Sequence, residues 1–164
     1  MTAETDFRAV FSHLGAVANY ARRRGSTDAE ALAAEVMTIA WRRLRDVPKG
    51  DPRPWLFATA RNLLLAEFRA RGRTPHLAER DLPAPEFAEL DSQLRGALLA
   101  LSPLDREALL LVAWEDLTPS QAGQALGINP AAFRVRLLRA RRRLRARLED
   151  DGPAPLPVPE VEGS

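Results

Sequence analysis

The stretch TPSQAGQALGINPAAFRVRLLRARRRL, residues 118–144, dictates how its half of the chain folds. Thr118 and Gln121 form a capping box around a proline, which predicts the start of a short helix. Gly127 ends that helix, because glycine readily adopts the left-handed backbone of a tight turn. Asn129, followed by another proline, predicts the start of a second helix. Two short capped helices joined by a glycine-containing turn are typical of a helix-turn-helix.

The second of these helices, predicted from Pro130 to about Leu148, has one apolar and one cationic face. Residues 133–148 contain eight arginines and no acidic side chain, a pattern typical of proteins that bind a polyanion. The N-terminal turns of a recognition helix enter the major groove, where arginine bonds guanine and small apolar side chains contact thymine. The alternative is a solvated helix face with a purely structural role. The DNA-binding interpretation predicts contacts from Ala131, Arg134, Val135, Arg136, Arg139 and Arg141.

The composition of the 164 residues excludes several other classes of protein. The absence of cysteine excludes disulfides, thiolate zinc sites and cysteine nucleophiles. The sequence contains neither a cluster of acids and bases typical of catalysis nor a glycine-rich phosphate loop. We therefore expect no enzyme, no metal and no cofactor. No apolar run is long enough to span a bilayer and the acidic N-terminus lacks a signal core. We therefore expect a cytoplasmic protein without membrane insertion.

The sequence pattern of residues 1–73 predicts a compact unit of three helices. Gly25 ends the first helix, and Thr27 with Glu30 forms a capping box that starts the second. The loop 47–54, with three prolines and a glycine, precedes the third helix. Apolar side chains at three- and four-residue spacing place these helices over residues 6–24, 28–45 and 55–73.

The remaining segments complete the predicted organisation. Residues 74–92 contain three prolines and five acidic side chains, which indicates a linker. A second helical unit, residues 93–149, contains the helix-turn-helix, and a proline-rich acidic tail, residues 150–164, follows it. Strand-like alternation is absent from the sequence. We therefore predict an all-α fold of two small helical domains, joined by an acidic linker and able to dock or to move independently.

A second, weaker nucleic-acid signal lies in the third helix. Trp55 and Asn62, together with several arginines along the same helix, combine the aromatic and cationic groups that bind single-stranded nucleic acid. The alternative places Trp55 in the core beside its apolar neighbours. We also expect Trp41 and Trp114 to lie in apolar cores.

These motifs, taken in order, resemble the extracytoplasmic-function (ECF) group of sigma factors in the sigma-70 family. The segment DAEALAAEVMTIAW, residues 28–41, is similar to the helix of that family that binds core RNA polymerase. The segment WLFATARNLLL, residues 55–65, resembles the promoter-melting segment, and the C-terminal helix-turn-helix resembles the module for the upstream promoter element. The likeness extends over roughly residues 7–73 and 93–148. Each motif alone is weak, but their order and spacing are specific.

The resemblance implies a protein that binds core RNA polymerase and directs it to particular promoters. Asn62 would read a flipped-out base of the downstream element, and the loop 49–55 would help to hold that base. The helix-turn-helix would read the upstream element as duplex DNA. The resemblance also makes an anti-sigma protein a candidate partner. It implies polymerase contacts near exposed parts of Leu32, Glu35, Val36 and Ile39, and downstream-promoter contacts from Lys49, Arg53, Trp55, Arg61, Asn62 and Arg69.

The sequence departs from the family pattern at a few positions. Ala31 and Ala34 stand where acidic and glutamine side chains are common, which leaves fewer polar contacts for the polymerase. Gly123 replaces the usual alanine of the helix-turn-helix, and we expect slightly looser packing there. A further hypothesis is that the acidic tail 151–164 folds back on the basic helix 133–148 and weakens the binding of free DNA.

Two other functions remain open from the residues alone. A DNA-binding regulator that acts without polymerase would explain the C-terminal unit but would leave the pattern over residues 28–73 without a role. A polymerase-interacting module without promoter reading is the second alternative, which Ala31 and Ala34 mildly favour. Salt-dependent DNA binding distinguishes these functions, because only phosphate contacts release counterions.

Overall fold

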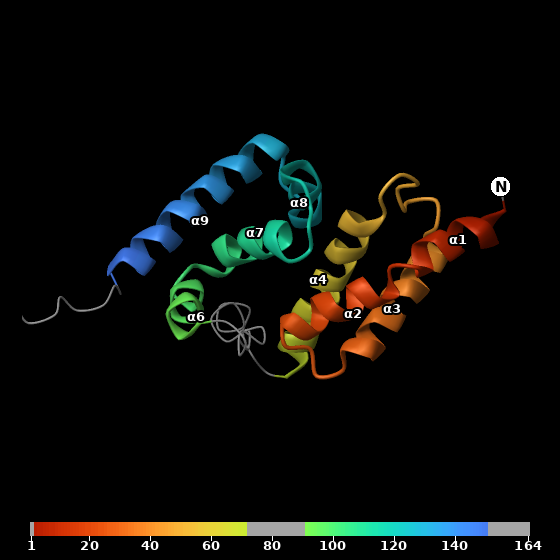
Figure 1. Ribbon diagram of the computed structural model, residues 1–164. Helices are drawn as coiled ribbons and strands as arrows, with labels where there is room; N and C mark the ends of the chain where they lie inside the picture. The colour runs from red at the N-terminus through yellow and green to blue at the C-terminus, as the bar shows by residue number, and fades with distance from the viewer. Residues whose placement is uncertain (1, 72–90, 151–164) are drawn as a thin grey trace, which may run out of the picture.

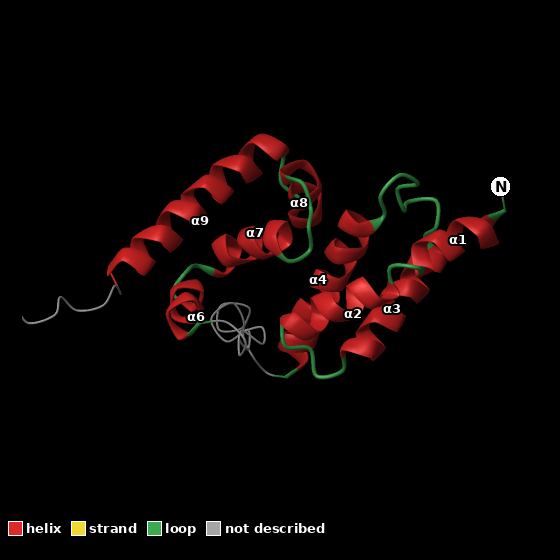
Figure 2. Ribbon diagram, viewed as in Figure 1, coloured by secondary structure: helices red, strands yellow, loops and turns green. Residues whose placement is uncertain are grey.

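The computed structural model describes residues 2–71 and 91–150, and within these ranges every regular element is a helix (Figure 2). The predicted all-α fold of two helical domains is confirmed. The predicted linker lies outside the described residues except for Asp91 and Ser92, the N-cap and first residue of the next helix. The helices are α1 (Ala3–Phe11), α2 (Leu14–Arg23), α3 (Ala29–Arg42), α4 (Arg53–Ala70), α6 (Ser92–Leu99), α7 (Pro103–Ala113), α8 (Pro119–Leu126) and α9 (Pro130–Asp150).

The N-terminal segment forms two helices where the sequence predicted one over residues 6–24. The chain turns at Ser12 and His13, where the Ser12 hydroxyl donates to the Ala9 carbonyl at 2.6 Å. A serine side chain that bonds a backbone carbonyl competes with regular helix geometry. The break lets α1 pack on α3 while α2 packs on both α3 and α4 (Figure 1).

The cap of α3 also differs from the predicted capping box. The Asp28 carboxylate, rather than Thr27, accepts from the Ala31 amide at 3.0 Å. Thr27 instead donates its amide and hydroxyl to Glu67 of α4, and Glu30 forms an ion pair with Arg22. The start of α3 is therefore attached to α4, a contact between residues 40 positions apart that no local pattern reveals.

The helix-turn-helix has the predicted form. The hydroxyl of Thr118 accepts from the backbone amide of Gln121 at 3.2 Å. The side-chain Oε1 of Gln121 accepts in turn from the backbone amide of Thr118 at 3.0 Å. Gly127 has a φ of 70°, in the left-handed region, and ends α8. Asn129 caps α9 by accepting from the Ala132 amide at 2.7 Å. On the buried face of α9, Phe133, Leu137 and Ala140 are at most 4% exposed.

The two halves of the chain share one apolar core. α4 lies between α2 and α3 on one side and α8 on the other (Figure 1). Phe57 and Leu64 of α4 belong to the same buried cluster as Leu111, Ala122 and other side chains of the C-terminal half. A smaller cluster of Leu98, Leu101 and Leu110 holds α6 on α7. The two units are thus docked, which was one of the two arrangements the sequence allowed.

Gly123 corrects the expectation of looser packing at that position. A Cβ atom on this residue would lie 2.9 Å from the Ile128 carbonyl oxygen and 3.5 Å from the Phe133 Cβ. The Ile128 amide donates to the Gly123 carbonyl at 2.9 Å, so the turn closes directly on this part of α8. Glycine is therefore required because the backbone of the turn approaches α8 too closely for a side chain.

We expect the Gly123→Ala variant to lose about 1–3 kcal/mol of the free energy of unfolding, because the added methyl group overpacks the turn. Urea unfolding followed by circular dichroism measures the loss. The control is Gly96→Ala in α6, where no atom lies within 4 Å of the added Cβ. This control should be stabilised by about 0.5–1 kcal/mol through helix propensity. Equal stabilities of the two variants would contradict the close approach.

Candidate nucleic-acid interface

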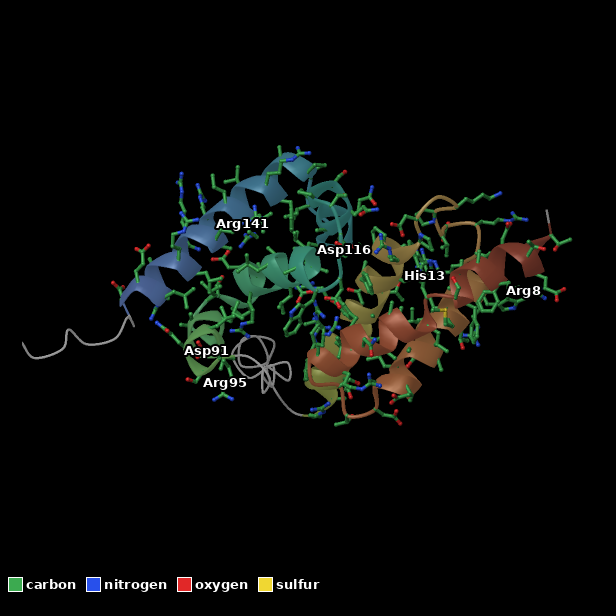
Figure 3. All side chains as sticks on the ribbon, viewed as in Figure 1. Arg8, His13, Asp91, Arg95, Asp116 and Arg141 are labelled. Atoms are coloured by element: carbon green, nitrogen blue, oxygen red, sulfur yellow. The ribbon has the colours of Figure 1, made fainter. Side chains whose placement is uncertain are left out.

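The outer surface of α9 carries the cationic side chains of the predicted upstream site. Figure 3 labels Arg141 on this helix and shows nitrogen-tipped side chains projecting from it into solvent. Val135 is 49% exposed and Leu138 is 50% exposed, so an apolar strip lies between the arginines. Such a surface offers both phosphate contacts and apolar contacts to bases. The exposed members of the predicted set are Ala131, Arg134, Val135, Arg139 and Arg141.

Arg136 differs from the rest of this set. It is half-buried, and its Nη1 donates to the Asp105 carboxylate of α7 at 3.2 Å. Arg143, two turns further along α9, donates to the other oxygen of the same carboxylate. The Asp105 side chain is only 2% exposed. One buried acidic group thus engages Arg136 of the predicted set and a second arginine of the same helix.

The downstream set divides over two faces of α4. Trp55, Asn62 and Arg69 are seven residues apart, so they lie along one side of the helix. Asn62 and Arg69 are exposed, whereas Trp55 is half-buried with the Arg43 guanidinium 5.8 Å from its ring centroid. Arg61 lies on the other side, toward Tyr20 of α2. The structure therefore aligns three of the predicted residues and separates Arg61 from them.

The loop before α4 is attached to the helix-turn-helix. Arg53 donates to the Asp51 carboxylate, with 2.7 Å between its Nη2 and Oδ2. This contact holds the pKa of Asp51 below its usual range, although burial opposes the shift. Gln121 of α8 donates to the same Asp51 oxygen at 2.7 Å, while Lys49 in the loop is exposed. The two predicted DNA-reading elements thus meet through Asp51.

A buried ionic cluster joins the two halves beside this loop. Arg24, at the end of α2, is 4% exposed and donates through Nε to the Glu107 carboxylate at 2.8 and 3.0 Å. Its Nη2 lies 3.4 Å from Glu115, which also accepts from Arg23 at 2.7 Å. The Tyr20 hydroxyl donates to Glu107 at 3.1 Å. No local pattern of residues indicates this cluster, because its partners are 83 to 92 positions apart.

The cluster is electrically matched despite its burial. Burial raises the pKa of the Tyr20 phenol, which stays protonated and can donate to Glu107. Burial alone would lower the pKa of Arg24, but Glu107, Tyr20 and Glu115 more than compensate, so its pKa is raised. The guanidinium of Arg24 also lies 3.6 Å from the Tyr20 ring centroid. A charge of each sign therefore has a partner within the interface, as burial requires.

The predicted polymerase-binding residues of α3 require a correction. Leu32 is 7% exposed and Val36 is fully buried, because both face the core between α2 and α4. Glu35 is exposed and Ile39 is half-buried. Trp41, which we expected in the core, is 51% exposed. Of the four predicted residues, only Glu35 and Ile39 therefore reach the solvent-facing side of α3.

An aromatic cluster extends the exposed side of α3 onto α1. The Phe7 ring meets Trp41 edge to face with 5.0 Å between centroids, and Phe11 lies 5.9 Å from Phe7. Phe11 is 47% exposed. The sequence assigned these side chains to packing, because a helical periodicity cannot tell an exposed aromatic from a buried one at the edge of an apolar stripe.

Residues 2–71 and 91–150 lack two further features. No group of three or more histidine or acidic side chains in these ranges is arranged to hold a metal ion. None of the helices there is both long enough and apolar enough to cross a membrane.

Comparison with known families agrees with the order of these elements. The family model for sigma-70 region 2 matches residues 10–74, which hold α2, α3 and α4. The family model for sigma-70 region 4 matches residues 91–144, which hold the helix-turn-helix. The chain belongs to the sigma-70 family, as a member of its ECF group.

Relatives support the ECF assignment. The ECF RNA polymerase sigma factor SigE of Mycolicibacterium smegmatis is 32% identical over 130 residues, covering 72% of this chain and 51% of that protein. The ECF RNA polymerase sigma factor SigM of Bacillus subtilis is 29% identical over 128 residues, covering 72% of this chain and 78% of that protein. The chain thus spans about half the length of the mycobacterial relative.

Two solved structures match most of the length of the chain. CnrH, in complex with the cytosolic domain of CnrY, has a TM-score of 0.64 and 27% identity, covering 92% of this chain and 91% of CnrH. The sigma factor RpoE of Bartonella quintana, in complex with the anti-sigma factor NepR, has a TM-score of 0.61 and 25% identity. That match covers 88% of this chain and 96% of RpoE.

We expect Arg24→Met to separate the two halves, because it leaves Glu107 and Glu115 buried without their shared cation. Removing one partner of a buried ion pair costs about 3–5 kcal/mol. Small-angle scattering should show a larger radius of gyration, and denaturant unfolding should show the loss of stability.

The control for this prediction is Arg22→Met. Arg22 pairs with Glu30 on the surface, with side-chain exposures of 44% and 73%. The loss of such a pair costs less than about 1 kcal/mol. If both variants kept the wild-type radius and stability, the cluster would not be what joins the halves.

Proposed function

We propose that this chain binds core RNA polymerase and directs it to promoters by reading two DNA elements with its two halves. The observation that carries the proposal is the presence of an exposed cationic recognition helix and an Asn62-bearing helix on one chain, in the order of sigma-70 regions 2 and 4. A stand-alone regulator would need only the first of these. The proposed role is regulatory rather than enzymatic and belongs to the cytoplasm, where core polymerase meets DNA.

In this proposal α9 reads the upstream element in duplex form. Ala131 and Val135 lie near the N-terminal end of α9, which is the part of a recognition helix that reaches base edges. Arg134 and Arg141 lie seven residues apart on one flank and contact phosphates along one strand. Arg139 lies toward the opposite flank. The apolar strip that ends at Leu138 supplies contacts to thymine methyl groups.

The downstream element is read by the exposed stripe of α4. Asn62 presents an amide with two donors and one acceptor, which suits the hydrogen-bonding edge of an extruded base. Arg69, two turns further along α4, and Lys49, in the loop before α4, attract the backbone of the melted strand. Trp55 is partly covered by Arg43 and the core, so it supports the pocket with one edge rather than a whole stacking face.

The polymerase-binding surface lies on the exposed side of α3. Ala34, Glu35, Thr38 and Trp41 project from that side, and Leu32 and Val36 act by holding the helix in place. Trp41 is the largest exposed apolar side chain there, and aromatic side chains of this kind dominate the energetics of protein interfaces. We propose Trp41 and Glu35 as the main polymerase contacts, with Ile39 at the edge.

The docked arrangement has a consequence for this function. Gln121 of the helix-turn-helix donates to Asp51 of the base-holding loop. When the halves are docked, each of these two elements is therefore in contact with the other instead of with DNA. Simultaneous reading of two separated promoter elements requires the halves to move apart. We propose that polymerase binding drives this separation, and that an anti-sigma protein, such as the partner of RpoE in its solved complex, would favour the docked form.

Co-elution with bacterial core RNA polymerase at about 0.3 M salt tests the proposed function, because that salt screens loose charge attraction. We expect the wild-type chain to co-elute. Trp41→Ala should weaken polymerase binding by about tenfold or more, as expected for an interface residue whose truncation costs about 1.4 kcal/mol or more.

The matched control is Arg95→Ala on α6, an exposed side chain on the half that carries the helix-turn-helix. It should co-elute like the wild type. If the wild-type chain binds duplex DNA but does not co-elute, the function is that of a regulator acting without polymerase. If Trp41→Ala co-elutes normally, the polymerase surface lies elsewhere than on the exposed side of α3.

A further inference from the structure

Asp105 stands out among the acidic side chains of the C-terminal half. Its carboxylate is 2% exposed and lies under α9, in the first turn of α7. Arg136 contacts one of its oxygens and Arg143 contacts the other. Figure 1 shows α7 running beneath α9, so the contacts join two helices of the DNA-binding half.

The two arginines occupy one flank of α9. Positions 136 and 143 are seven residues apart, which is nearly two helical turns and places both on the same side. Arg134 and Arg141 have the same spacing on the opposite flank, and no acidic residue of the described chain pairs with them. Four arginines of equal formal charge therefore divide into a pair with a buried counter-charge and a pair without one.

A DNA phosphate does not easily replace the Asp105 carboxylate as the partner of Arg136 and Arg143. A phosphate that drew Arg136 and Arg143 away would leave the Asp105 carboxylate buried and unpaired, which is far more costly than the gain from an exposed ion pair. The backbone amide of Asp105 also bonds the Ser102 hydroxyl, which fixes the backbone at the start of α7 beneath α9. The arginines thus stay with Asp105 when DNA approaches.

We propose that Asp105 limits which arginines of α9 contact DNA, by withholding Arg136 and Arg143 from phosphates. The contacts are left to exposed arginines without a buried counter-charge, such as Arg134 and Arg141. Asp105 is a positioning residue, since it touches the arginines and not the DNA. It limits the sequence-independent attraction of a helix with eight arginines in sixteen positions. This inference rests on the proposed function, because it concerns the same DNA-binding face.

The logarithmic salt dependence of duplex binding tests this assignment, since each phosphate contact adds about 0.9 to the slope. Anisotropy of a labelled mixed-sequence duplex measures the slope for the full chain. We expect Asp105→Asn to steepen the slope by about 1 to 2 and to tighten binding at low salt, because two arginines become available. The control Asp116→Asn makes the same change in net charge at an exposed loop residue and should leave the slope nearly unchanged.

A second comparison does not depend on the folding of the Asp105 variant. Arg141→Gln should reduce the slope by about 0.9, whereas Arg143→Gln should reduce it by much less. A further check does use the Asp105 variant: added to the Arg136→Gln, Arg143→Gln double variant, Asp105→Asn should no longer steepen the slope. A purely structural role of Asp105 would lower the melting temperature of Asp105→Asn without steepening its slope.

The outcomes separate the inference from the proposed function. Equal slope losses in Arg141→Gln and Arg143→Gln, with normal binding by the wild type, would overturn the role of Asp105 and leave the DNA-binding function standing. If the wild-type chain binds no duplex DNA at low salt but co-elutes with polymerase, the Asp105 inference fails while the polymerase role stands. A wild-type chain that does neither overturns both.

Discussion

The pairing of Arg24 with Glu107 and Glu115 is the constraint around which the molecule is arranged. Each of these groups would be costly to bury alone, and together they bring the end of α2 against α7 and the segment after it. Their position fixes where α8 meets α4, and hence where the loop before α4 meets the helix-turn-helix. The apolar core shared by the two halves then closes around this ionic centre.

The buried ionic contacts of Arg24 and of Asp105 have different roles in the fold. The Arg24 cluster joins the halves, so it has to be disrupted for them to separate. The Asp105 pairs lie within one half and would persist through that separation. Arg106, beside Asp105 in the chain, donates to the carbonyls of Leu98, Leu99 and Leu101 and fastens α6 onto α7. These contacts of the DNA-binding half do not involve the other half of the chain.

Local sequence patterns predicted the parts of this fold that local physics determines. The capping box at Thr118, the left-handed Gly127 and the Asn129 cap all depend on neighbours within four residues, and all three have the predicted form. The break at Ser12 was missed because a plausible helix pattern continued through it. The cap at Asp28 was missed because Thr27 and Glu30 offered a competing capping box one residue earlier. The need for glycine at position 123 was missed as well, since it arises from the return of the chain at Ile128.

The candidate sites were predictable only in part, for the same reason. An amphipathic stripe gives the apolar residues of a helix but not how far each is covered by its neighbours, so Leu32 and Val36 were expected at the surface and Trp41 was not. Eight arginines on α9 looked equivalent until Asp105, from a distant segment, distinguished two of them. The partners that decide such questions are separated by 31 to 92 positions, beyond the reach of any periodicity.

The exposed loop before α4 holds one more feature with a practical side. Lys49 is the sole lysine among the 24 basic residues of the chain, so its ε-amine is unique among the side chains. Amine-directed chemistry therefore has one side-chain target, and that target stands beside the proposed base-holding pocket. A fluorophore or cross-linker attached there would report directly on the surroundings of the loop. Acetylation at the same atom would remove the positive charge of Lys49 without altering any arginine on the molecule.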